Sequence, residues 1–453
     1  MLPTEPLPWA LDALPLRAER YRRYGAYYEG AHRFPFASER YRKDFGRMLA
    51  EARVNLCARV VDAHADRLAV VGFGDRAQAE ANDAADRAWA LWLINSLDLR
   101  QGEVYQEAFR AGDGYVLVWP REDARGRPVP RLYPQRADQV TVHYDDDTPG
   151  QIDAAAKAWK REDNYWRVTL YLPDRIEKYV STQAAARGSG FPRKADSFQP
   201  YQPEGEPWPL PNPFGRVPMF HFGNNAHLGG FGRSELADVV PIQDALNKTA
   251  MDLLVTSEFM AYPQRWAVGV AAFTDPDSGE EVQPFQAGAD RVWTVPAPDA
   301  RFGEFMAANL NQLVSQKQEL QLDIARVSSV PVHYLLMTGQ YPSGESLKTA
   351  EAPFVAKLED RQRAFGAVWA DALAFALVLD GMGATELATR WAAAAPRSEQ
   401  ETWSVAQLKL AAGVSPDQVQ REGGYSPEQI QSMKTESADA MAARGAVIPE
   451  AFA

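Results

Sequence analysis

The chain has 453 residues, of which 46% are hydrophobic and 24% are charged. These proportions are ordinary for a globular protein, so they exclude a disordered, collagen-like or coiled-coil protein. The 48 lysines and arginines against 60 aspartates and glutamates give a net charge of −12. This charge argues against a surface that holds nucleic acid by its phosphates, but it leaves open a protein past which DNA moves without being gripped.

Cys57 is the only cysteine, so the chain cannot form an intramolecular disulfide, a CxxC zinc site or an iron–sulfur cluster. The first residues lack the basic-then-apolar order of a signal peptide. No segment approaches the roughly 18 to 20 uninterrupted apolar residues that span a bilayer. The longest apolar stretch, Trp369–Leu379, contains Asp371. We therefore expect a soluble protein of a reducing compartment with no membrane partner, in which Cys57 is a small core residue.

The first 235 residues are predicted to form an α+β unit, because helical patterns precede strand patterns in blocks. The expected helices cover Asp44–Val71, ending at a turn at Gly72 and Gly74, then Asp83–Leu97 and Gln101–Ala111. The expected strands cover Tyr115–Trp119, Gln139–Tyr144, Tyr165–Leu172 and Val217–Phe222. In Tyr165–Leu172 one residue in two is apolar, which is typical of a strand buried on one face.

The segment YRRYGAYY mixes arginines with Tyr21, Tyr24, Tyr27 and Tyr28. Aromatic residues between basic ones can form a platform on which nucleic-acid bases stack. The pattern also fits a helix that packs its tyrosines on a neighbouring element and leaves its arginines in water. We favour this second interpretation.

Residues 183–216 contain seven prolines and four glycines and show no periodicity. A segment so rich in proline is excluded from the centre of a sheet. Long ordered loops are usually functional, so one interpretation is an arm that contacts another subunit. The other is a flexible insertion, and the sequence favours neither.

The second half of the chain is predicted to be mainly helical. One helix follows Ser234, a possible N-cap, and ends before Pro263. A small α/β or β insert separates it from a second helix over about Phe305–Val327. An uncharged loop, Val330–Gly344, leads into a long helix over Ser346–Leu379.

The long helix is predicted to bury one face and to expose the other. The buried face is marked by Phe354, Leu358, Phe365, Trp369, Ala372 and Ala376. The exposed face carries Lys357, Glu359, Asp360, Arg361 and Arg363. Short helices from Glu399, separated at Gly413–Pro416 and Gly423–Pro427, are expected to follow.

The best candidate for a metal site is the acidic run Asp145–Asp147 next to His143, because Mg²⁺ prefers oxygen ligands. An exposed turn explains these residues better, since Thr148, Pro149 and Gly150 follow them at the end of a strand. We therefore expect no bound metal, no cofactor and no catalytic residue.

Other candidate sites are weaker. Gly229, Gly230 and Gly232 precede an expected helix start, where a phosphate can bind, but the lysine of a nucleotide-hydrolysing loop is missing. Ser343 lacks the GxSxG context of a nucleophile. The six histidines lie far apart in the sequence and include His64, which we expect to be packed or at the surface.

Several stretches, taken in order, carry a resemblance to a known family. They are YYEG at Tyr27, NLCARVVDAHADRLAVVGF from Asn55, AGDGYVLVW from Ala111, GRSELADVVPIQDALNKTAMDLL from Gly232, AYPQRW from Ala261 and PSGESLK from Pro342. With these stretches the chain resembles the portal proteins of tailed bacteriophages and is similar to the SPP1-type group. The resemblance covers nearly the whole chain.

The resemblance implies an α+β, mainly helical fold with the wing, stem, clip and crown of a portal subunit. The wing would comprise residues 1–235, with the proline-rich arm 183–216, and a long helix in 346–395. The remaining parts would be stem helices 236–261 and 305–327, the clip 262–304, the tunnel loop 328–345 and the helical crown 396–453.

The resemblance also implies a ring, typically a dodecamer, around a channel for double-stranded DNA. The channel would be lined in the tunnel loop by Tyr334, Leu335, Leu336, Met337, Thr338, Gln340 and Tyr341. Uncharged side chains suit this position, because each lysine or arginine on a phosphate would add affinity and hence friction. The stem would contribute Ile242, Leu246, Leu253 and Phe259 to the subunit interface. Repulsion between subunits of charge −12 predicts that ring assembly depends on salt.

The partners implied by the resemblance are the terminase large subunit, the head-to-tail connector, the major capsid protein and the scaffolding protein. The chain would lie at a capsid vertex of the virion, and in the host cytoplasm during assembly. The alternative function is a metal-dependent nucleic-acid enzyme that uses His143 and Asp145–Asp147. Particle size separates the two, since a ring is far larger than a monomeric or dimeric enzyme.

Overall fold

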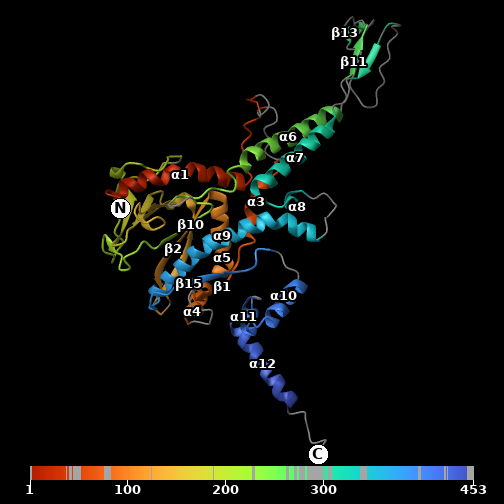
Figure 1. Ribbon diagram of the computed structural model, residues 1–453. Helices are drawn as coiled ribbons and strands as arrows, with labels where there is room; N and C mark the ends of the chain where they lie inside the picture. Colours follow the sequence, from red (N-terminus) through yellow and green to blue (C-terminus); the bar gives the residue numbers. More distant parts are fainter. Residues whose placement is uncertain are drawn as a thin grey trace, which may run out of the picture. The chain divides into compact units, whose positions relative to one another are not determined.

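The computed structural model describes residues 3–445, except residues 37, 40–42, 44–52, 76–82, 124, 187, 227–229, 262–264, 270–272, 275–280, 283–298, 300, 305–308, 337–343, 396–398, 423–424 and 426 (Figure 1). It consists of two units. One comprises residues 1–25, 61–235 and 342–453, and we call it the sheet unit. The other comprises residues 26–60 and 236–341, and we call it the helix-pair unit.

The sheet unit contains two main antiparallel sheets. The three-stranded sheet has the order β10-β2-β3, with β2 at Asp113–Glu122, β3 at Pro128–Gln135 and β10 at Met219–Gly223. The second sheet has the order β4-β5-β6-β7-β8 and comprises β4 (Val140–Tyr144), β5 (Ile152–Lys160), β6 (Trp166–Tyr171), β7 (Arg175–Ser181) and β8 (Phe198–Pro200), with β9 (Leu210–Pro211) also paired to β7. These elements confirm the predicted α+β class.

The second sheet is covered on both faces. Ala156, Val168 and Leu170 lie on one face and pack on α1 (Pro6–Tyr28), at Ala10 and Leu11 among others. Ala155, Tyr171 and Ile176 lie on the other face and pack on Leu117 and Met219 of the three-stranded sheet. Consecutive residues of β6 from Val168 to Tyr171 are therefore all buried. The prediction of a strand buried on one face only was wrong, because local alternation does not show that a second layer covers the polar-looking face.

The proline-rich segment 183–216 folds in part onto the edge of the second sheet. Its strands β8 and β9 both pair with β7. The Trp208 indole donates to the Lys178 carbonyl at 2.8 Å, and the Asn212 amide donates to the Leu172 carbonyl at 2.8 Å. This placement agrees with the exclusion of the segment from a sheet centre.

Two helices lead into β2. They are α4 (Asp83–Ile94) and α5 (Leu97–Ala111), so α5 begins four residues before the predicted start at Gln101. Gly112 ends α5 with φ 100°, a left-handed conformation that glycine adopts without steric cost. The predicted helix end at Ala111 is confirmed.

The helix predicted over Asp44–Val71 was only partly right. The described helix is α3 (Leu56–Ala65), and residues 44–52 lie outside the described part of the chain. Val70–Asp75 forms strand β1, which pairs with β15 (Leu387–Trp391) and contains Gly72 and Gly74. The partner strand lies more than three hundred residues away, so local periodicity could not reveal this pairing.

The long helix α9 (Gly344–Leu379) confirms the predicted helix and its buried face. Trp369 is completely buried against the rings of Trp92 and Phe222, at centroid distances of 4.8 and 4.7 Å. Its indole donates to the Tyr105 hydroxyl at 3.0 Å. By length and composition α9 is apolar enough to cross a membrane. Half of its most apolar 18-residue stretch is buried inside the subunit, as in a core helix.

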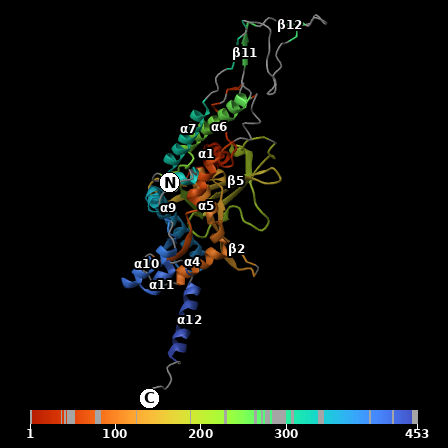
Figure 2. The ribbon, with the colours of Figure 1, turned by 90° about the vertical axis from the view of Figure 1, so that its right-hand side faces the viewer.

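The helix-pair unit is built on α6 (Val239–Ala261) and α7 (Leu310–Ser328), which lie side by side in both views (Figures 1 and 2). The insert between them forms β-structure, in which β11 (Arg265–Val268) pairs with β14 (Arg301–Glu304) and β12 (Phe273–Thr274) with β13 (Glu281–Val282). The short helix α8 (Val332–Leu335) follows α7. Towards the end of the chain come α10 (Glu399–Ala411), α11 (Pro416–Glu422) and α12 (Pro427–Gly445), as predicted.

Candidate functional site

The residues predicted to form the subunit interface lie on α6. Leu246 is fully buried within the subunit, so this side chain offers no surface to a neighbouring subunit. Ile242 and Leu253 are half-buried. The side chain of Phe259 lies outside the described part of the structure.

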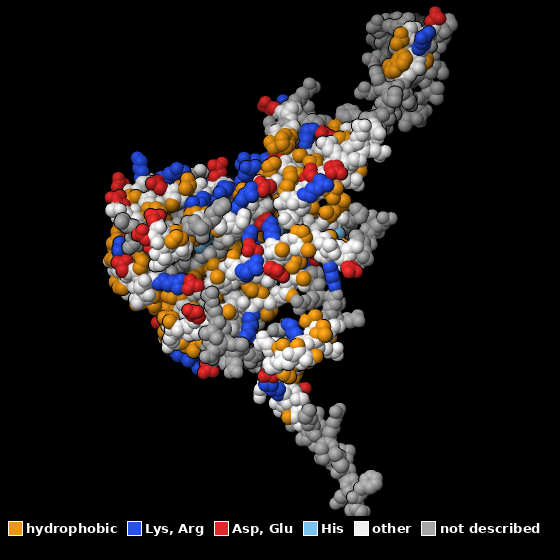
Figure 3. Space-filling model, in the orientation of Figure 1, with side chains coloured by type: hydrophobic (Ala, Val, Ile, Leu, Met, Phe, Trp, Pro, Cys, Tyr) orange, Lys and Arg blue, Asp and Glu red, His pale blue; other side chains and the backbone are white. Residues whose placement is uncertain are grey.

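Other apolar side chains of the helix pair are exposed. Leu254 on α6 is 45% exposed, and Val314 and Val327 on α7 are 39% and 44% exposed. Figure 3 shows hydrophobic side chains at the surface of this helix pair. The sequence analysis did not single these residues out.

The residues predicted to line the channel fall in and after α8. Tyr334 and Leu335 belong to this single helical turn, and Leu336 ends it by donating its N–H to the Val332 carbonyl at 2.9 Å. The segment was predicted to be a loop, and this turn departs from that prediction. The other predicted channel residues, Met337, Thr338, Gln340 and Tyr341, and also Ser343, lie outside the described residues.

A buried polar face of α6 holds the described residues around Tyr27 and His32 and around Val54 and Leu56, a contact that the sequence did not predict. The Tyr27 hydroxyl donates to the Asp244 carboxylate at 2.8 Å. The His32 ring lies between the Tyr27 carbonyl, at 2.9 Å, and the Asn247 amide, at 2.8 Å, and it stacks on the Tyr27 ring. Burial lowers the pKa of His32, so the neutral ring is favoured.

Gln243 extends the same face of α6. Its side-chain oxygen accepts from the Leu56 N–H at 3.0 Å, and its amide donates to the Val54 carbonyl at 2.7 Å. Gln243, Asp244 and Asn247 are each less than 5% exposed. Asn247 follows Asp244 by three residues and Gln243 by four, a spacing that places their side chains side by side on the helix, and that is the signal that could have revealed them.

Asp113 is the centre of a buried polar cluster in the sheet unit. Its side chain is completely buried. One carboxylate oxygen accepts from His221 Nε2 at 2.8 Å and from the Gly232 N–H at 2.6 Å. The other oxygen accepts from the Tyr21 hydroxyl at 2.5 Å, and the Tyr144 hydroxyl contacts the second nitrogen of His221. Asp113 thus joins α1, β2, β10 and the loop that follows β10.

Two of the four tyrosines of YRRYGAYY are buried, in agreement with the interpretation that we favoured. Tyr21 and Tyr27 are 6% and 1% exposed. Their hydroxyls donate to buried carboxylates and are not available for base stacking.

We expect the Asp113 cluster to make the protein sensitive to acid. Burial raises the pKa of Asp113, but the hydrogen bonds from His221, Tyr21 and Gly232 outweigh burial and leave the pKa below its ordinary value. The unfolded chain binds this proton more readily, so the contribution of Asp113 to stability is present above about pH 4 and is lost as the pH falls through the folded-state pKa. Urea unfolding at a series of pH values measures this loss.

Asp113→Asn is the matched variant. At pH 7 it should lower the free energy of unfolding by about 2 kcal/mol, because hydrogen bonds to a charged group are replaced by neutral ones. Below about pH 4 its stability should fall less steeply than that of the parent chain. Parallel curves for the two proteins would show that Asp113 does not carry the acid sensitivity.

Gly232, the last glycine of the glycine-rich stretch, serves packing and does not lie at the start of a helix. A Cβ on Gly232 would lie 2.0 Å from the Gly112 carbonyl oxygen and 2.6 Å from the Asn224 nitrogen. The Gly232 N–H is already bound to Asp113, and α6 begins only at Val239. Gly229 lies outside the described residues.

Ser234 was predicted as a possible N-cap of the helix that follows it, but it does not cap α6. Its hydroxyl donates to the Arg110 carbonyl at 2.5 Å, at the C-terminal end of α5. Residues 235–238 form a turn before α6 begins. The prediction failed because a serine can satisfy carbonyls at one helix end as readily as N–H groups at another.

Arg361 was predicted to lie on the exposed face of α9, and this prediction was wrong. It is 7% exposed, and its Nε donates to the Asn224 side chain at 2.6 Å. Nearby, Lys357 donates to Glu235 at 2.6 Å. Burial raises the pKa of Glu235, but interaction with His64 and Lys357 and hydrogen bonds from Lys357 and Asn224 outweigh it and lower the pKa. These pairs fix the loop after β10 to α9.

The acidic run next to His143 is a turn. The Asp147 N–H donates to the Asp145 carboxylate at 3.1 Å, and Asp146 and Asp147 are exposed. His143 contacts Asp153 at 2.7 Å instead of the run. Among the described residues, no group of three His, Cys, Asp or Glu side chains is arranged to hold a metal ion.

Cys57 and His64 are packed in the interior. Cys57 is completely buried, and burial raises its pKa to about 12, so the thiol is protonated and unreactive. His64 is completely buried against the rings of Phe109 and Phe354. The prediction of a packed Cys57 is confirmed.

Comparison with known proteins identifies the family. The family model of SPP1 Gp6-like phage portal proteins matches residues 9–442. The chain belongs to this family. The match spans both units, and it confirms the resemblance carried by the stretches from Tyr27 to Pro342.

Two portal proteins of mycobacteriophages are similar to this chain. The chain is 25% identical over 331 residues to the portal protein of Mycobacterium phage D29 and 25% identical over 334 residues to that of Mycobacterium phage L5. Each alignment covers 70% of this chain and 63% of the relative. The chain thus spans less than two thirds of the length of the curated portal proteins it matches.

Solved structures from gene transfer agent particles are also similar. One, from the virion of a native particle, has 13% identity and a TM-score of 0.42 and covers 82% of this chain and 90% of that chain. Another, from the neck of an empty particle, has 12% identity and a TM-score of 0.43 and covers 82% of this chain and 88% of that chain.

Proposed function

We propose that copies of this chain form a ring, typically a dodecamer, at a capsid vertex, around the channel through which double-stranded DNA is packaged and ejected. The observation that carries this proposal is the match of the portal family model to residues 9–442. The ring would place the chain in the virion, and in the host cytoplasm during assembly.

The helix pair α6 and α7 would form the stem of each subunit. Exposed apolar side chains on both helices, Leu254 and Val314 among them, support this assignment, because a closed ring buries one patch of each subunit against a different patch of its neighbour. Ile242 and Leu253 would contribute their remaining exposed surface. The β-structure of residues 262–304 would form the clip.

The segment from α8 onward would approach the DNA. Tyr334, Leu335 and Leu336, and the predicted channel residues Met337, Thr338, Gln340 and Tyr341, carry no charge. Uncharged side chains can touch a duplex without neutralising phosphates, so they add little salt-dependent affinity. The net charge of −12 agrees with a channel from which DNA is readily released.

The clip would dock the terminase large subunit during packaging and the head-to-tail connector afterwards. The sheet unit, with α9, would form the wing, and α10 to α12 the crown. The wing would meet the major capsid and scaffolding proteins. These assignments follow the order of elements in the portal family.

Electron microscopy of the purified chain tests the proposal. We expect ring-shaped particles with a central hole in end views, and fewer of them at low ionic strength, because subunits of charge −12 repel one another when screening is weak. Solid particles of the size of a monomer or dimer at every salt concentration would contradict the ring.

A further inference from the structure

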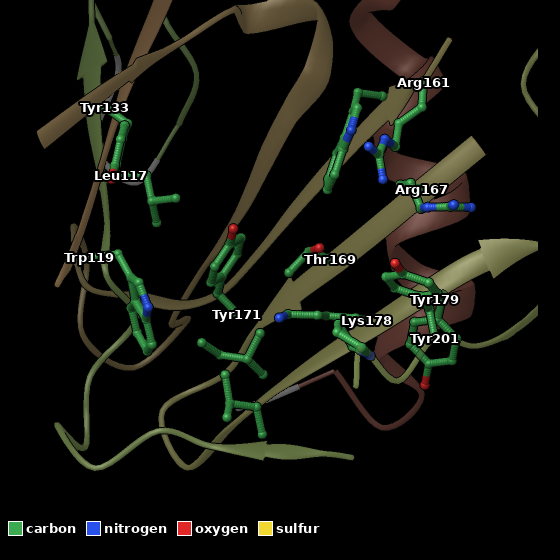
Figure 4. A pocket seen from close by; sticks show the side chains of 14 residues that line it. Leu117, Trp119, Tyr133, Arg161, Arg167, Thr169, Tyr171, Lys178, Tyr179 and Tyr201 are labelled. Atoms are coloured by element: carbon green, nitrogen blue, oxygen red, sulfur yellow. The ribbon is translucent and has the colours of Figure 1, made fainter. Parts of the chain in front are cut away.

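A cavity of about 510 Å³ lies on the face of the second sheet that α1 does not cover (Figure 4). Its floor is formed by strands β5, β6 and β7, at Thr169 and Tyr171 among others. Leu117 and Trp119 of β2 form one wall, and Tyr201 of the proline-rich segment lies at the opposite side. Its volume is typical of a site that receives a ligand or a few side chains.

Aromatic rings make up much of the lining. Trp119, Trp159, Tyr171 and Tyr201 all contribute, and the two tryptophans and Tyr201 are only half-buried. Large half-buried rings favour contact with another apolar group, because they lose water-exposed area when it binds. The cavity is thus suited to an apolar or aromatic anchor.

The charged residues of the lining all have one sign. The 14 lining residues include Arg161, Arg167 and Lys178 and no carboxylate. Lys178 is paired with Glu206, whereas Arg161 is exposed and makes no ion pair within the described part of the chain. A lining without carboxylates stands out in a chain of net charge −12 and favours an anionic ligand.

Arg167 has hydrogen-bonding capacity that the subunit leaves unused. Its side chain is only 11% exposed, and its guanidinium lies 4.6 Å from the centre of the Tyr201 ring. One nitrogen, Nη2, donates to Asp163 at 3.1 Å. Its Nε and Nη1 are buried and have no hydrogen-bond partner among the described residues. Buried donors are almost always satisfied, so these two point to a ligand that supplies oxygen acceptors.

We propose that this cavity binds an acidic peptide segment of another protein. An apolar side chain of the segment enters between Trp119, Trp159 and Tyr201, and carboxylates on either side of it bind Arg161 and Arg167. The site recognises the peptide by this combination of an apolar anchor and flanking negative charge. The inference stands apart from the ring and the channel, since it concerns the sheet unit alone.

The same features disfavour nucleic acid as the ligand. A duplex is too wide for a cavity of about 510 Å³, and its affinity requires a broad basic surface. A single strand needs successive exposed rings along a basic groove, whereas here the rings enclose one compact space. The experiment nevertheless includes single-stranded DNA as a competitor of the peptide.

Selection from a random-sequence peptide library on the purified full-length chain tests the proposal. We expect the enriched peptides to combine aspartate or glutamate with an aromatic or leucine residue. Affinity of a labelled enriched peptide, measured by fluorescence anisotropy, should fall roughly tenfold or more in Arg167→Gln, because a charge-assisted hydrogen bond is lost. Arg161→Gln should weaken binding severalfold, and since Arg161 is exposed this variant keeps the fold.

Arg125→Gln is the matched control, because it removes the same charge from an exposed position outside the cavity and should leave the affinity unchanged. Three outcomes would overturn the proposal. In the first, no peptide is enriched on the parent chain relative to the Arg161→Gln variant. In the second, the enriched peptides show no excess of aspartate or glutamate. In the third, oligothymidylate displaces the bound peptide at a lower concentration than a second acidic peptide does.

Discussion

Replacing Gly232 by alanine is expected to lower the free energy of unfolding by about 3 kcal/mol, near the upper end for steric overpacking. The added Cβ would lie 2.0 Å from the Gly112 carbonyl oxygen, and neither backbone segment can move freely. Gly112 ends α5 in a left-handed conformation, and the Gly232 N–H is bound to the buried Asp113. Any shift that relieves the clash therefore breaks the Asp113 cluster. Chemical denaturation followed by circular dichroism measures the loss.

Gly190→Ala is the control for this change. Gly190 lies in the proline-rich segment, and a Cβ there would meet no atom within 4 Å. The free energy of unfolding of the Gly190→Ala variant should stay within about 0.5 kcal/mol of that of the parent chain, as for most surface substitutions. Equal stability of Gly232→Ala and Gly190→Ala would show that the close approach of Gly112 and Gly232 is not a constraint on the fold.

Leu254→Asp is expected to abolish the large particle and to leave folded monomers. Burying a leucine against a neighbouring subunit is worth about 1.5 to 3 kcal/mol, and a desolvated aspartate costs several kcal/mol more. The penalty recurs at every interface of a closed ring, so a modest change at one residue becomes a large change in assembly. Size-exclusion chromatography with light scattering measures the particle, and circular dichroism verifies that the monomer is folded.

Leu99→Asp provides the matched comparison. Leu99 on α5 is 82% exposed, so the same substitution is made at an exposed leucine outside the helix pair. This variant should assemble like the parent chain. If Leu254→Asp also forms intact rings, the exposed side of α6 does not lie in the subunit interface.

The elements predicted correctly are those whose signal is local and repeated. The buried face of α9 recurs from Phe354 to Ala376, so it was predicted from residues close together in the chain. Strand β1 was missed because its stability depends on pairing with Leu387–Trp391. Strand β6 was recognised, but its second buried face depends on a sheet formed by other segments.

The polar clusters were beyond prediction for a similar reason. Asp113 stands in an apolar run, AGDGYVLVW, and an isolated acid in such a run is the one local sign that it is buried. Its partners Tyr21, His221 and Gly232 come from distant segments, so their convergence is a property of the fold. Arg361 was predicted to be solvated because it lies among charged residues, and only packing shows that it is buried.

The family, the mixed α+β class, most helices and the acidic, cysteine-poor character of the chain could all be predicted from the sequence. These properties depend on composition, on local periodicity and on the order of recognisable stretches. Only the folded chain shows which polar groups are buried together, which glycines touch and where a cation-lined cavity opens. Such features depend on distances between segments remote in sequence, and these distances are set only when the layers pack.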